Sequence, residues 1–503
     1  MTRPSSFARP QYLSEKPARK WEITMERSKM FVGGEWVESL SGETFADLNP
    51  ATGEVFAEVP KGNEKDADRA LQAAFEGRKI WASTPPGQRA AVLYKASELL
   101  SSRIQDFAHV LINESGATFG KAMFEVTYTV DLLRTAGEDC RRLLGETFPS
   151  DHNKLSMTVY RPIGTVVAIT PWNFPLLLSV NKVAYGLAAG NTVVLKPASE
   201  TPVIGLMIGD LLAQAGLPSG ALNVVTGPGG VLGDYLVEDD RTSFVTLTGE
   251  TKTGLRVAQK AAARLKKFTL ELGGKDPLLV CDDVDLGFAV DAAAFGAFMH
   301  QGQICMSVER VIVHEKIAEE FAKRLAAKAE SLPMGDPTKP ETVIGPMIND
   351  QQVKAVHGHV TEAVEKGAKV LTGGTYEGRF YRPTVLTGVT RQMKIFREET
   401  FGPTAPIITF STDEEALEIA NDSQYGLSSG VITKDLQRAL FFAENMECGM
   451  VHVNDASVHD EPFCPFGGCK MSGIGREGGR HSMEEMSEMK WVTIQRGQRH
   501  YPF

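Results

Sequence analysis

The sequence has few cysteines, and they show no pattern that would build a metal site or a disulfide framework. Its six cysteines are scattered over 503 residues, without a Cys-x-x-Cys pair and without histidines at the spacing of zinc ligands. Neither a metal nor a set of disulfides is therefore expected. Cys140, Cys281 and Cys448 lie in apolar surroundings and are expected to be buried thiols. Cys464 and Cys469 flank a glycine turn, and their roles stay open.

The sequence also lacks long apolar runs and any excess of basic residues. No apolar stretch reaches the length that spans a bilayer, so a membrane is not expected as a partner. Acidic residues outnumber basic residues by 63 to 53, and the formal net charge is −10. Dense runs of lysine and arginine, which would neutralise phosphates, are missing beyond the first thirty residues. Nucleic acid is therefore not expected as a partner either.

Residues 1–30 carry several basic residues but no apolar segment of the kind found in secretory signals. We expect a mobile N-terminal arm here. A mitochondrial presequence is the alternative, which three acidic residues disfavour: Glu15, Glu22 and Glu26. The expected location is the cytoplasm.

A chain of 503 residues is too long for one hydrophobic core, so two or more domains are expected. In the middle of the chain, short apolar runs alternate with segments of helical periodicity. Strands are predicted over 166–170, 192–195, 222–226, 244–248 and 268–270, with helices over 176–189 and 202–215. This order predicts an α/β fold with a parallel sheet that helices cover on both faces.

The same alternation starts again after the Gly273-Gly274 pair. Strands are predicted over 278–280 and 311–313, and helices over 286–298 and 317–329. A second α/β domain is therefore expected to begin at this pair, with a crevice between it and the first domain.

Two reactive side chains lie near this boundary. Glu271 stands in Glu-Leu-Gly-Gly-Lys and Cys305 in Gly-Gln-Ile-Cys. A thiolate attacks carbonyl carbon well, and a nearby carboxylate can activate the water that later releases the acyl group. The pair predicts a covalent acyl-transfer site.

These motifs resemble those of the aldehyde dehydrogenase superfamily, whose members have the glutamate and the cysteine in these contexts at this separation. The resemblance extends from about Phe31 to the C-terminus. It implies a Rossmann-type parallel-sheet cofactor domain, an α/β catalytic domain and a β-ribbon oligomerisation element. It also implies oxidation of an aldehyde to the carboxylic acid with NAD or NADP.

The implied division of the chain has four parts. After the arm 1–30 come a dinucleotide-binding domain (31–140 and 161–273), a catalytic domain (274–482) and an oligomerisation element (141–160 and 483–503). Alternating apolar and polar residues in the last part suggest exposed ribbon strands, whose edges invite pairing with another subunit. A homodimer or homotetramer is expected.

No predicted strand is followed by a Gly-x-Gly-x-x-Gly motif of the kind that binds a dinucleotide. Gly227-Pro-Gly-Gly follows a predicted strand, but its sixth position is Leu232, so an ordinary turn is the better interpretation. The family uses a variant with glycines five apart, and Gly249 and Gly254 resemble it, before a helix N-terminus that can meet pyrophosphate. The resemblance implies further cofactor contacts from Lys196 at the adenosine ribose, Glu399 at the nicotinamide ribose, and Phe401 and Trp172.

Position 199 bears on the choice between the two cofactors. Many NAD-preferring relatives have glutamate three residues after the family lysine, where it repels a 2′-phosphate. Here the position is Ser199, and Glu200 follows it, so NADP stays open. NAD is narrowly preferred because Glu200 can still present a charge there.

Asn173 stands in Pro-Trp-Asn-Phe-Pro after a predicted strand, where asparagine is most often a turn former. The resemblance implies instead that its amide and the Cys305 backbone N–H hold the oxyanion. The implied reaction passes through a Cys305 thiohemiacetal and a thioester, which water activated by Glu271 hydrolyses. Lys182 and Glu477 are expected behind these groups or on a water path, and an exposed salt bridge is the alternative for Glu477.

This chain has His300 five residues before Cys305, where many relatives have asparagine. With the segment 453–463, His300 makes the chain similar to the branch that oxidises benzaldehyde, vanillin or salicylaldehyde. An aromatic aldehyde is therefore the expected substrate, in a pocket lined by Phe174, Met299, His300, Phe463 and Phe466. The alternative is that these residues are ordinary core, with His300 packed and hydrogen-bonded.

Other functions stay open. An aliphatic aldehyde or a semialdehyde is the alternative substrate within the superfamily, although no Lys/Arg pair stands out as a carboxylate clamp. A cofactor-free thiol hydrolase or acyltransferase would also use Cys305, Asn173 and Glu271, but not Lys196 and Glu399. A non-catalytic relative would typically have lost the thiol or the carboxylate, and both are present.

Overall fold

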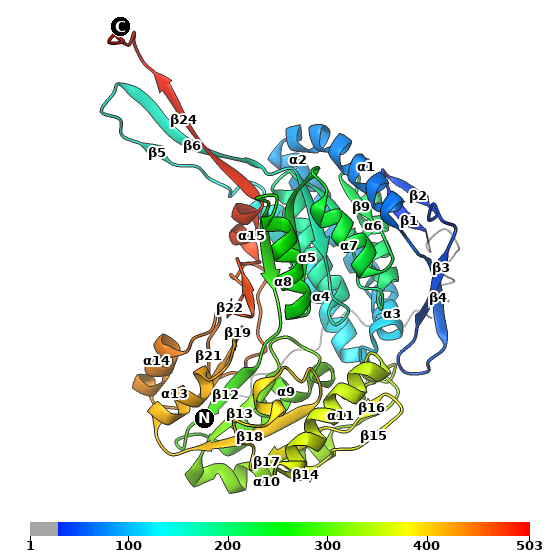
Figure 1. The fold of residues 1–503 in the computed structure, drawn as a ribbon, viewed down its shortest axis with the longest axis vertical. Coiled ribbons are helices and arrows are strands. Elements are labelled where there is room, and N and C mark those ends of the chain that lie inside the picture. The colour runs from blue at the N-terminus through cyan, green and yellow to red at the C-terminus, as the bar shows by residue number, and fades with distance from the viewer. Residues whose placement is uncertain (1–28) are drawn as a thin grey trace.

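The computed structural model describes residues 29–503, so the expected N-terminal arm falls outside the described residues up to residue 28. Two units, each built on one sheet, and a projecting ribbon make up the described chain (Figure 1). The α/β architecture with parallel sheets that the sequence predicts is confirmed.

The first unit is built on an eight-stranded sheet whose five central strands are parallel. Its order is β2 (Glu35–Val37), β1 (Met30–Val32), β9 (Leu222–Val224), β8 (Thr192–Lys196), β7 (Thr165–Ile169), β10 (Thr242–Thr248), β11 (Lys267–Glu271) and β23 (Gly473–Ile474). The last strand comes from far along the chain, inside the range expected for the catalytic domain, and it pairs antiparallel with β11.

Helices cover both faces of this sheet because successive residues of a buried strand point to opposite sides. Val166 and Val193 pack with helices of one face, whereas Val167 and Val194 pack with helices of the other. The helices of the unit are α1 (Glu64–Ser83), α2 (Pro86–Ser102), α3 (Ile104–Ser115), α4 (Phe119–Asp139), α5 (Pro175–Ala188), α6 (Pro202–Gln214), α7 (Gly229–Glu238), α8 (Thr251–Ala262) and α15 (Gly479–Glu485).

The second unit is built on a seven-stranded sheet, which is parallel except for its edge strand β14. Its order is β14 (Lys369–Thr372), β17 (Thr384–Thr387), β18 (Thr404–Phe410), β13 (Val308–His314), β12 (Asp276–Val280), β20 (Gly430–Ile432) and β21 (His452–Val453). Its helices are α9 (Leu286–Phe298), α10 (Glu315–Ser331), α11 (Asp350–Glu365), α12 (Lys394–Arg397), α13 (Asp413–Asn421) and α14 (Leu436–Asn445). They form two cores, one on each face of the sheet.

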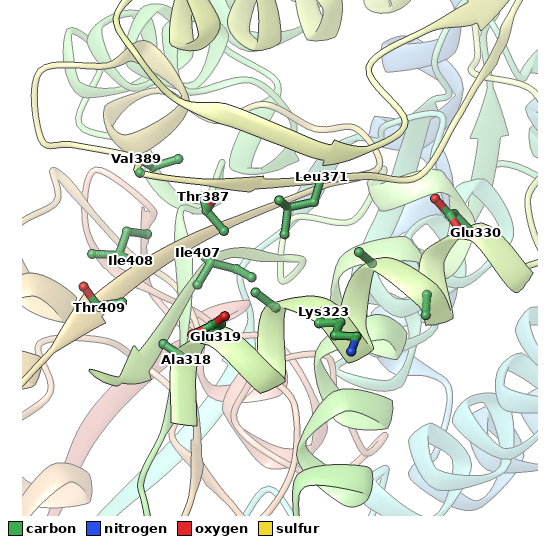
Figure 2. Close-up of a pocket in the computed structure, with 14 residues that line it drawn as sticks. Ala318, Glu319, Lys323, Glu330, Leu371, Thr387, Val389, Ile407, Ile408 and Thr409 are labelled. Atoms are coloured by element: carbon green, nitrogen blue, oxygen red, sulfur yellow. The ribbon is translucent and has the colours of Figure 1, made fainter. Parts of the chain in front are cut away.

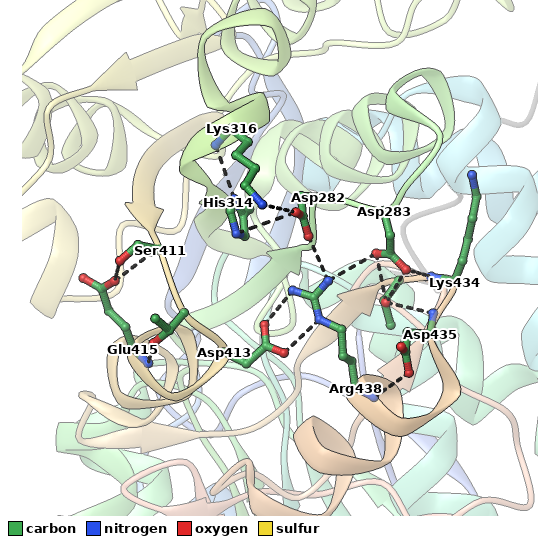
Figure 3. Close-up of polar contacts among 12 residues, drawn as sticks. Asp282, Asp283, His314, Lys316, Ser411, Asp413, Glu415, Lys434, Asp435 and Arg438 are labelled. Carbon is green, nitrogen blue, oxygen red and sulfur yellow. Dashed lines mark hydrogen bonds and ion pairs between the residues drawn. The ribbon is translucent and has the colours of Figure 1, made fainter.

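A network of ion pairs ties the elements of the second unit together at the end of β12 (Figure 3). Arg438 on α14 contacts Asp413 on α13 at 2.6 Å and Asp282 after β12 at 2.9 Å. Lys316 on α10 contacts the same Asp282 at 3.0 Å. Since this network joins four elements around one arginine and lies outside the large cavity described below, we interpret it as structural.

The ribbon projects away from both units (Figure 1). It consists of β24 (Ser487–Gln495), β6 (Lys154–Pro162) and β5 (Thr147–Phe148), all antiparallel. Three small two-stranded sheets complete the fold: β3 (Thr44–Leu48) with β4 (Val55–Pro60), β15 (Tyr376–Glu377) with β16 (Phe380–Tyr381), and β19 (Tyr425–Gly426) with β22 (Cys469–Lys470). Among residues 29–503, no helix combines the length and the apolar character that crossing a membrane requires.

Candidate functional site

Cys305 lies between a short 3-10 helix, Met299–Gly302, and strand β13. The backbone that leads to it is in the left-handed region at two non-glycine residues, His300 with φ of 49° and Gln301 with φ of 57°. Such conformations cost free energy and persist where surrounding contacts fix them. One such contact is the Gln301 side chain, whose Nε2 donates to the Pro346 carbonyl at 2.8 Å.

The residues around Gln303 tie this loop to both units. Asn173 Nδ2 donates to the Gln303 carbonyl oxygen at 3.0 Å, and the Ile348 N–H donates to Gln303 Oε1 at 3.0 Å. Asn173 belongs to the first unit and Cys305 to the second, so this hydrogen bond fixes the amide beside the loop that carries the thiol.

Glu271 is the last residue of β11, at the carboxyl edge of the first sheet, and its side chain is buried. Neither carboxylate oxygen has a hydrogen-bond partner among the described residues. A side chain at Gly467 would come within 2.7 Å of Glu271 Oε1, so only glycine leaves room there. Burial raises the pKa of Glu271 well above its ordinary value, and the Glu477 carboxylate adds to this rise, whereas Lys182 opposes it.

The pKa of the Cys305 thiol is also raised well above its ordinary value. Burial is the largest cause, and the carboxylates of Asp276, Glu399 and Glu271 add to it. A hydrogen bond from the Met306 backbone N–H has the opposite, smaller effect. The thiol is therefore protonated in this state and must lose its proton before it can act as a nucleophile.

Lys182 and Glu477 form a buried ion pair beside Glu271. Glu477 also accepts hydrogen bonds from Thr246 Oγ1 at 2.8 Å and from Asn181 Nδ2 at 3.4 Å. The alternative of an exposed salt bridge for Glu477 is therefore wrong. A buried pair with these partners holds one fixed negative and one fixed positive charge near the candidate base.

Asn173 precedes α5, where Pro175 takes the first helical position that suits proline. Two residues that were not predicted from sequence hold this helix start. Glu125 on α4 accepts the Leu176 N–H at 2.9 Å and so caps α5 with its carboxylate. Lys121, one turn earlier on α4, contacts Glu125 at 2.5 Å and donates to the Asn173 carbonyl at 2.7 Å. The sequence shows that Lys121 and Glu125 are four residues apart, but it does not show that they contact the start of α5.

A cavity of about 960 Å³ opens beside these groups. Most of its lining is aliphatic or aromatic and comes from α4, α5, α9 and the segment after β21. The residues expected from sequence that line it are Cys305, Asn173, Phe174, Met299, His300 and Phe466. This is the size and character of a site for a small organic molecule.

One expected pocket residue, Phe463, differs from its prediction. Phe463 does not line the cavity and is 59% exposed, while its backbone lies close against Gly479. His300 lines the cavity as expected and is packed there, with its ring 5.6 Å from that of Phe174. Burial lowers the pKa of His300 well below its ordinary value, so the ring is neutral.

At the carboxyl end of β8, Lys196 and Ser199 lie against the turn that begins at Gly227. Lys196 Nζ donates to the Pro197 carbonyl at 2.8 Å, and a Cβ at Gly229 would lie 3.8 Å from this nitrogen. Ser199 Oγ donates to the Gly227 carbonyl at 3.2 Å. The Gly227 turn, predicted as an ordinary turn, thus lies in this corner and leads directly into α7. Sequence analysis did not place it beside Lys196, because the motif lacks its last glycine. Burial lowers the pKa of Lys196 to about 8.

The glycines five apart lie where β10 runs into α8. Gly249 follows the strand, and Gly254 packs so closely on Leu272 that a side chain there would clash. The N-cap residue Glu250 makes no side-chain capping bond, and the buried Thr248 hydroxyl has no partner among the described residues. Uncapped N–H groups and an unpartnered hydroxyl at a helix N-terminus fit a pyrophosphate group.

Glu399 lies against the Gly273-Gly274 pair. Its Oε1 accepts the Gly274 N–H at 3.1 Å, and a Cβ at Gly273 would come within 2.5 Å of its other oxygen. Burial raises the pKa of Glu399 to about 8. Two residues later, the Phe401 ring meets the Trp172 ring edge to face at 5.4 Å. The structure thus brings the expected aromatic pair together.

A buried pair that sequence analysis missed holds the segment of Glu399 and Phe401. Glu309 on β13 accepts the N–H groups of Thr400 and Phe401, both at 2.7 Å, and contacts Lys275 Nζ at 2.6 Å. Phe401 has a φ of 52°, a conformation rare for an aromatic residue. The Glu309 carboxylate compensates for this strain by binding both backbone donors.

A second hollow of about 650 Å³ lies between α10 and strands β14, β17 and β18 (Figure 2). Ala318, Lys323, Leu371 and Ile407 are among its lining residues. None of the residues expected to act in chemistry or cofactor binding lines it. The larger cavity beside Cys305 is therefore the candidate substrate site.

Known proteins are similar to this chain in sequence. The profile of the Aldehyde dehydrogenase family matches residues 36–492. A vanillin dehydrogenase of Pseudomonas fluorescens is 41% identical over 477 residues, which cover 94% of this chain and 99% of the relative. A benzaldehyde dehydrogenase of Bacillus subtilis is 39% identical, over 95% of this chain and 99% of the relative.

Solved structures are similar over the same extent. The salicylaldehyde dehydrogenase from Pseudomonas putida G7, complexed with salicylaldehyde, superposes with a TM-score of 0.93 at 40% identity. The match covers 94% of this chain and 99% of that one. A succinate-semialdehyde dehydrogenase from Burkholderia pseudomallei gives a TM-score of 0.91 at 37% identity, over 93% and 98% of the two chains.

Proposed function

Since this chain belongs to the aldehyde dehydrogenase family, we propose that it oxidises an aromatic aldehyde to the carboxylic acid with a nicotinamide dinucleotide as hydride acceptor. The oxidation of an aldehyde with NAD(P) follows from the family. The aromatic ring of the substrate is the finer inference. Its support is the largely apolar cavity beside Cys305, together with the names of relatives that act on vanillin, benzaldehyde and salicylaldehyde.

One observation carries the proposed chemistry: Cys305 and Asn173 line the same apolar cavity and are tied through the Gln303 carbonyl. In the proposed reaction the Cys305 thiol first gives its proton to water, and the resulting thiolate sulfur attacks the aldehyde carbon. The Asn173 amide and the Cys305 backbone N–H stabilise the oxyanion, which is typically worth a factor of about 100 to 1000 in rate for one donor. Loss of hydride leaves a thioester on Cys305.

Glu271 then acts as the general base. A buried carboxylate without hydrogen-bond partners has a raised pKa, which makes it a stronger base than an exposed glutamate. It takes a proton from water, and the hydroxide attacks the thioester and releases the acid. Lys182 and Glu477 act as positioning residues that set the electrostatic potential at Glu271.

The dinucleotide accepts the hydride when it is bound, and the chain has residues that fit it. The uncapped start of α8 with Gly249 and Gly254 suits the pyrophosphate, Lys196 and Ser199 the adenosine ribose, and Glu399 the nicotinamide ribose. Phe401 and Trp172 would border the nicotinamide. In this assignment 31–140 and 161–273 form the dinucleotide-binding domain, which also contributes Asn173 and Glu271 to the chemistry. Residues 274–482 form the catalytic domain, which carries Cys305 and also contributes Glu399 and Phe401 to the cofactor site.

We favour NAD over NADP narrowly. Ser199 is half-buried in the Lys196 corner, whereas Glu200 is exposed and able to bring a negative charge toward that corner.

The decisive experiment is a panel of aromatic and aliphatic aldehydes assayed by the absorbance of the reduced nicotinamide, with NAD and with NADP in parallel. We expect the highest kcat/KM for an aromatic aldehyde. A preference for aliphatic aldehydes or semialdehydes would contradict the proposed substrate, and a lack of cofactor binding by fluorescence would favour a thiol hydrolase.

Assembly and location complete the proposal. We expect a homodimer or homotetramer formed through the ribbon of 141–160 and 483–503. We also expect a cytoplasmic location, and cell fractionation tests it.

A further inference from the structure

The wall of the substrate cavity carries one acidic pair for which the proposed reaction has no use. Tyr128 on α4 and Asp460 after β21 both line the cavity. The Tyr128 hydroxyl donates to Asp460 Oδ2 at 2.7 Å, although the two residues are 332 positions apart. Both residues are half-buried, so a molecule in the cavity can reach them.

This pair offers hydrogen-bond acceptors and no free hydrogen. A tyrosine hydroxyl has one hydrogen, and here Asp460 takes it, which leaves lone pairs on both oxygens of the carboxylate and on the phenol. Burial and the Asp460 carboxylate raise the pKa of Tyr128, so the phenol keeps its proton. A ligand group that donates a hydrogen bond fits this site, whereas an ether or a carboxylate brings only further acceptors.

The charges of the cavity wall also disfavour a ligand that carries a carboxylate. Lys121 is paired with Glu125 at 2.5 Å, and Lys328 is paired with Asp291 at 2.8 Å. Each lysine among the described residues that line the cavity therefore has its own carboxylate. Asp460, by contrast, is bound to a neutral phenol, so an anionic ligand group meets a like charge there.

The surroundings strengthen a hydrogen bond at this point. Phe124, Val458 and Phe466 line the same cavity, and a hydrogen bond gains strength where apolar groups exclude water. Burial raises the pKa of Asp460 to about 7, while the Tyr128 hydrogen bond opposes that rise. At about pH 8.5 the carboxyl group is ionised and can only accept.

We propose that Tyr128 and Asp460 determine specificity by binding a hydroxyl group on the ring of an aromatic aldehyde and by disfavouring aldehydes that carry a carboxylate. The inference rests on the proposed function, because it requires that an aromatic aldehyde enters the cavity. It names the substrate class more closely: a ring with a hydrogen-bond donor in addition to the aldehyde.

The test compares ratios of kcat/KM at about pH 8.5. Each of the three monohydroxybenzaldehydes, the matching methoxybenzaldehydes and the carboxybenzaldehydes is measured relative to benzaldehyde. The concentration of each hydroxyl isomer is taken as that of its neutral phenol, because the formyl group lowers the phenol pKa below its usual value of about 10 and a phenolate donates no hydrogen bond. With the unchanged enzyme, at least one hydroxyl isomer exceeds its methoxy counterpart by about tenfold, as expected for a hydrogen bond to a charged group. The carboxybenzaldehydes give the lowest ratios.

The variant Asp460→Asn replaces the carboxylate by an amide that donates hydrogen bonds. We expect it to lower the hydroxyl ratio of that isomer about tenfold and to raise the carboxyl ratio. Asp131→Asn is the matched control, since Asp131 lies on α4, the helix that carries Tyr128, but is exposed and outside the cavity. The control should leave every ratio as it is.

The outcomes distinguish a failure of the Tyr128–Asp460 inference from a failure of the proposed function. If Asp460→Asn changes kcat/KM for all substrates by one common factor, the pair is a structural tie and the inference is overturned. If the unchanged enzyme prefers methoxy or carboxyl rings to hydroxyl rings, the inference is overturned without any variant. If it oxidises aliphatic aldehydes but no benzaldehyde, the proposed function itself fails.

Discussion

Removing the Cys305 sulfur should abolish the chemistry and leave cofactor binding nearly unchanged. Cys305→Ala should reduce aldehyde oxidation by roughly 10⁴-fold or more, because no other group can form the covalent adduct. Dinucleotide affinity, measured by fluorescence titration, should stay within a few-fold of the unchanged enzyme. Cys469→Ala is the control, since this thiol lies on β22 and outside the cavity, and it should keep its activity. Substantial turnover by Cys305→Ala would refute the mechanism.

In the proposed mechanism Glu271 acts after the hydride has left, so its loss should stop the cycle at the thioester. Glu271→Gln should give a burst of reduced cofactor near one equivalent per site and then stall as the thioester accumulates. In the unchanged enzyme, steady-state turnover should fall as the pH falls through the pKa of Glu271, which burial places above the ordinary value of about 4.3. Rapid-mixing absorbance over a pH series measures both. A variant without any burst would assign Glu271 to thiol deprotonation instead.

Ser199 tests the corner that is expected to face the adenosine ribose. A carboxylate placed there repels a 2′-phosphate, so Ser199→Glu should weaken NADP about tenfold or more and NAD much less. Ser199→Gln has nearly the same size without the charge and serves as the control. Dissociation constants for both cofactors from fluorescence titration decide the matter. Equal losses for NAD and NADP would show that position 199 does not face the 2′ carbon.

At the scale of elements, the segment that holds Glu399 and Phe401 depends on one carboxylate from β13. Glu309→Gln removes the partner of buried Lys275 and weakens the hold on the Phe401 N–H, so it should lower the free energy of unfolding by about 3 kcal/mol. Because the loosened segment carries the proposed cofactor contacts of Glu399 and Phe401, KM for the dinucleotide should rise more than KM for the aldehyde.

Denaturant unfolding and steady-state kinetics measure these two effects. Glu398→Gln is the control, as Glu398 is exposed in the same segment. A variant that loses stability while both KM values keep their ratio would limit Glu309 to a structural role.

The same segment shows what sequence could and could not provide. Local periodicity predicted the strands and helices around β7, β8, α5 and α6 to within a few residues, because each pattern depends on neighbours along the chain. Motifs placed Glu271, Cys305 and Asn173. The Glu309 contact with Phe401 and the Lys121 contact with Asn173 join distant segments, which only the folded topology brings together. The sequence neighbourhood of Phe463 predicts a place in the pocket, but the residue is exposed outside it, because neighbourhood along the chain does not fix where a side chain points.

At the scale of the whole molecule, the ribbon projects from the two units and leaves apolar side chains exposed (Figure 1). β24 and β6 pair along nine residues, and Met489 and Trp491 remain 58% and 71% exposed on it. Such strands offer backbone donors, acceptors and apolar side chains to a partner. If a second copy covers them, the assembly is a closed, symmetric homo-oligomer.

Deleting residues 491–503 removes more than half of β24 and leaves β6 with an open edge. We expect monomers or aggregates in size-exclusion chromatography with light scattering, and activity should fall as assembly fails. Deleting only 496–503 removes the tail after β24 and keeps its paired residues, so this shorter deletion should assemble like the full chain. A full-length protein that stays a stable, active monomer at micromolar concentration would contradict the prediction. The exposed apolar side chains of the ribbon would then require another explanation than contact between copies of this chain.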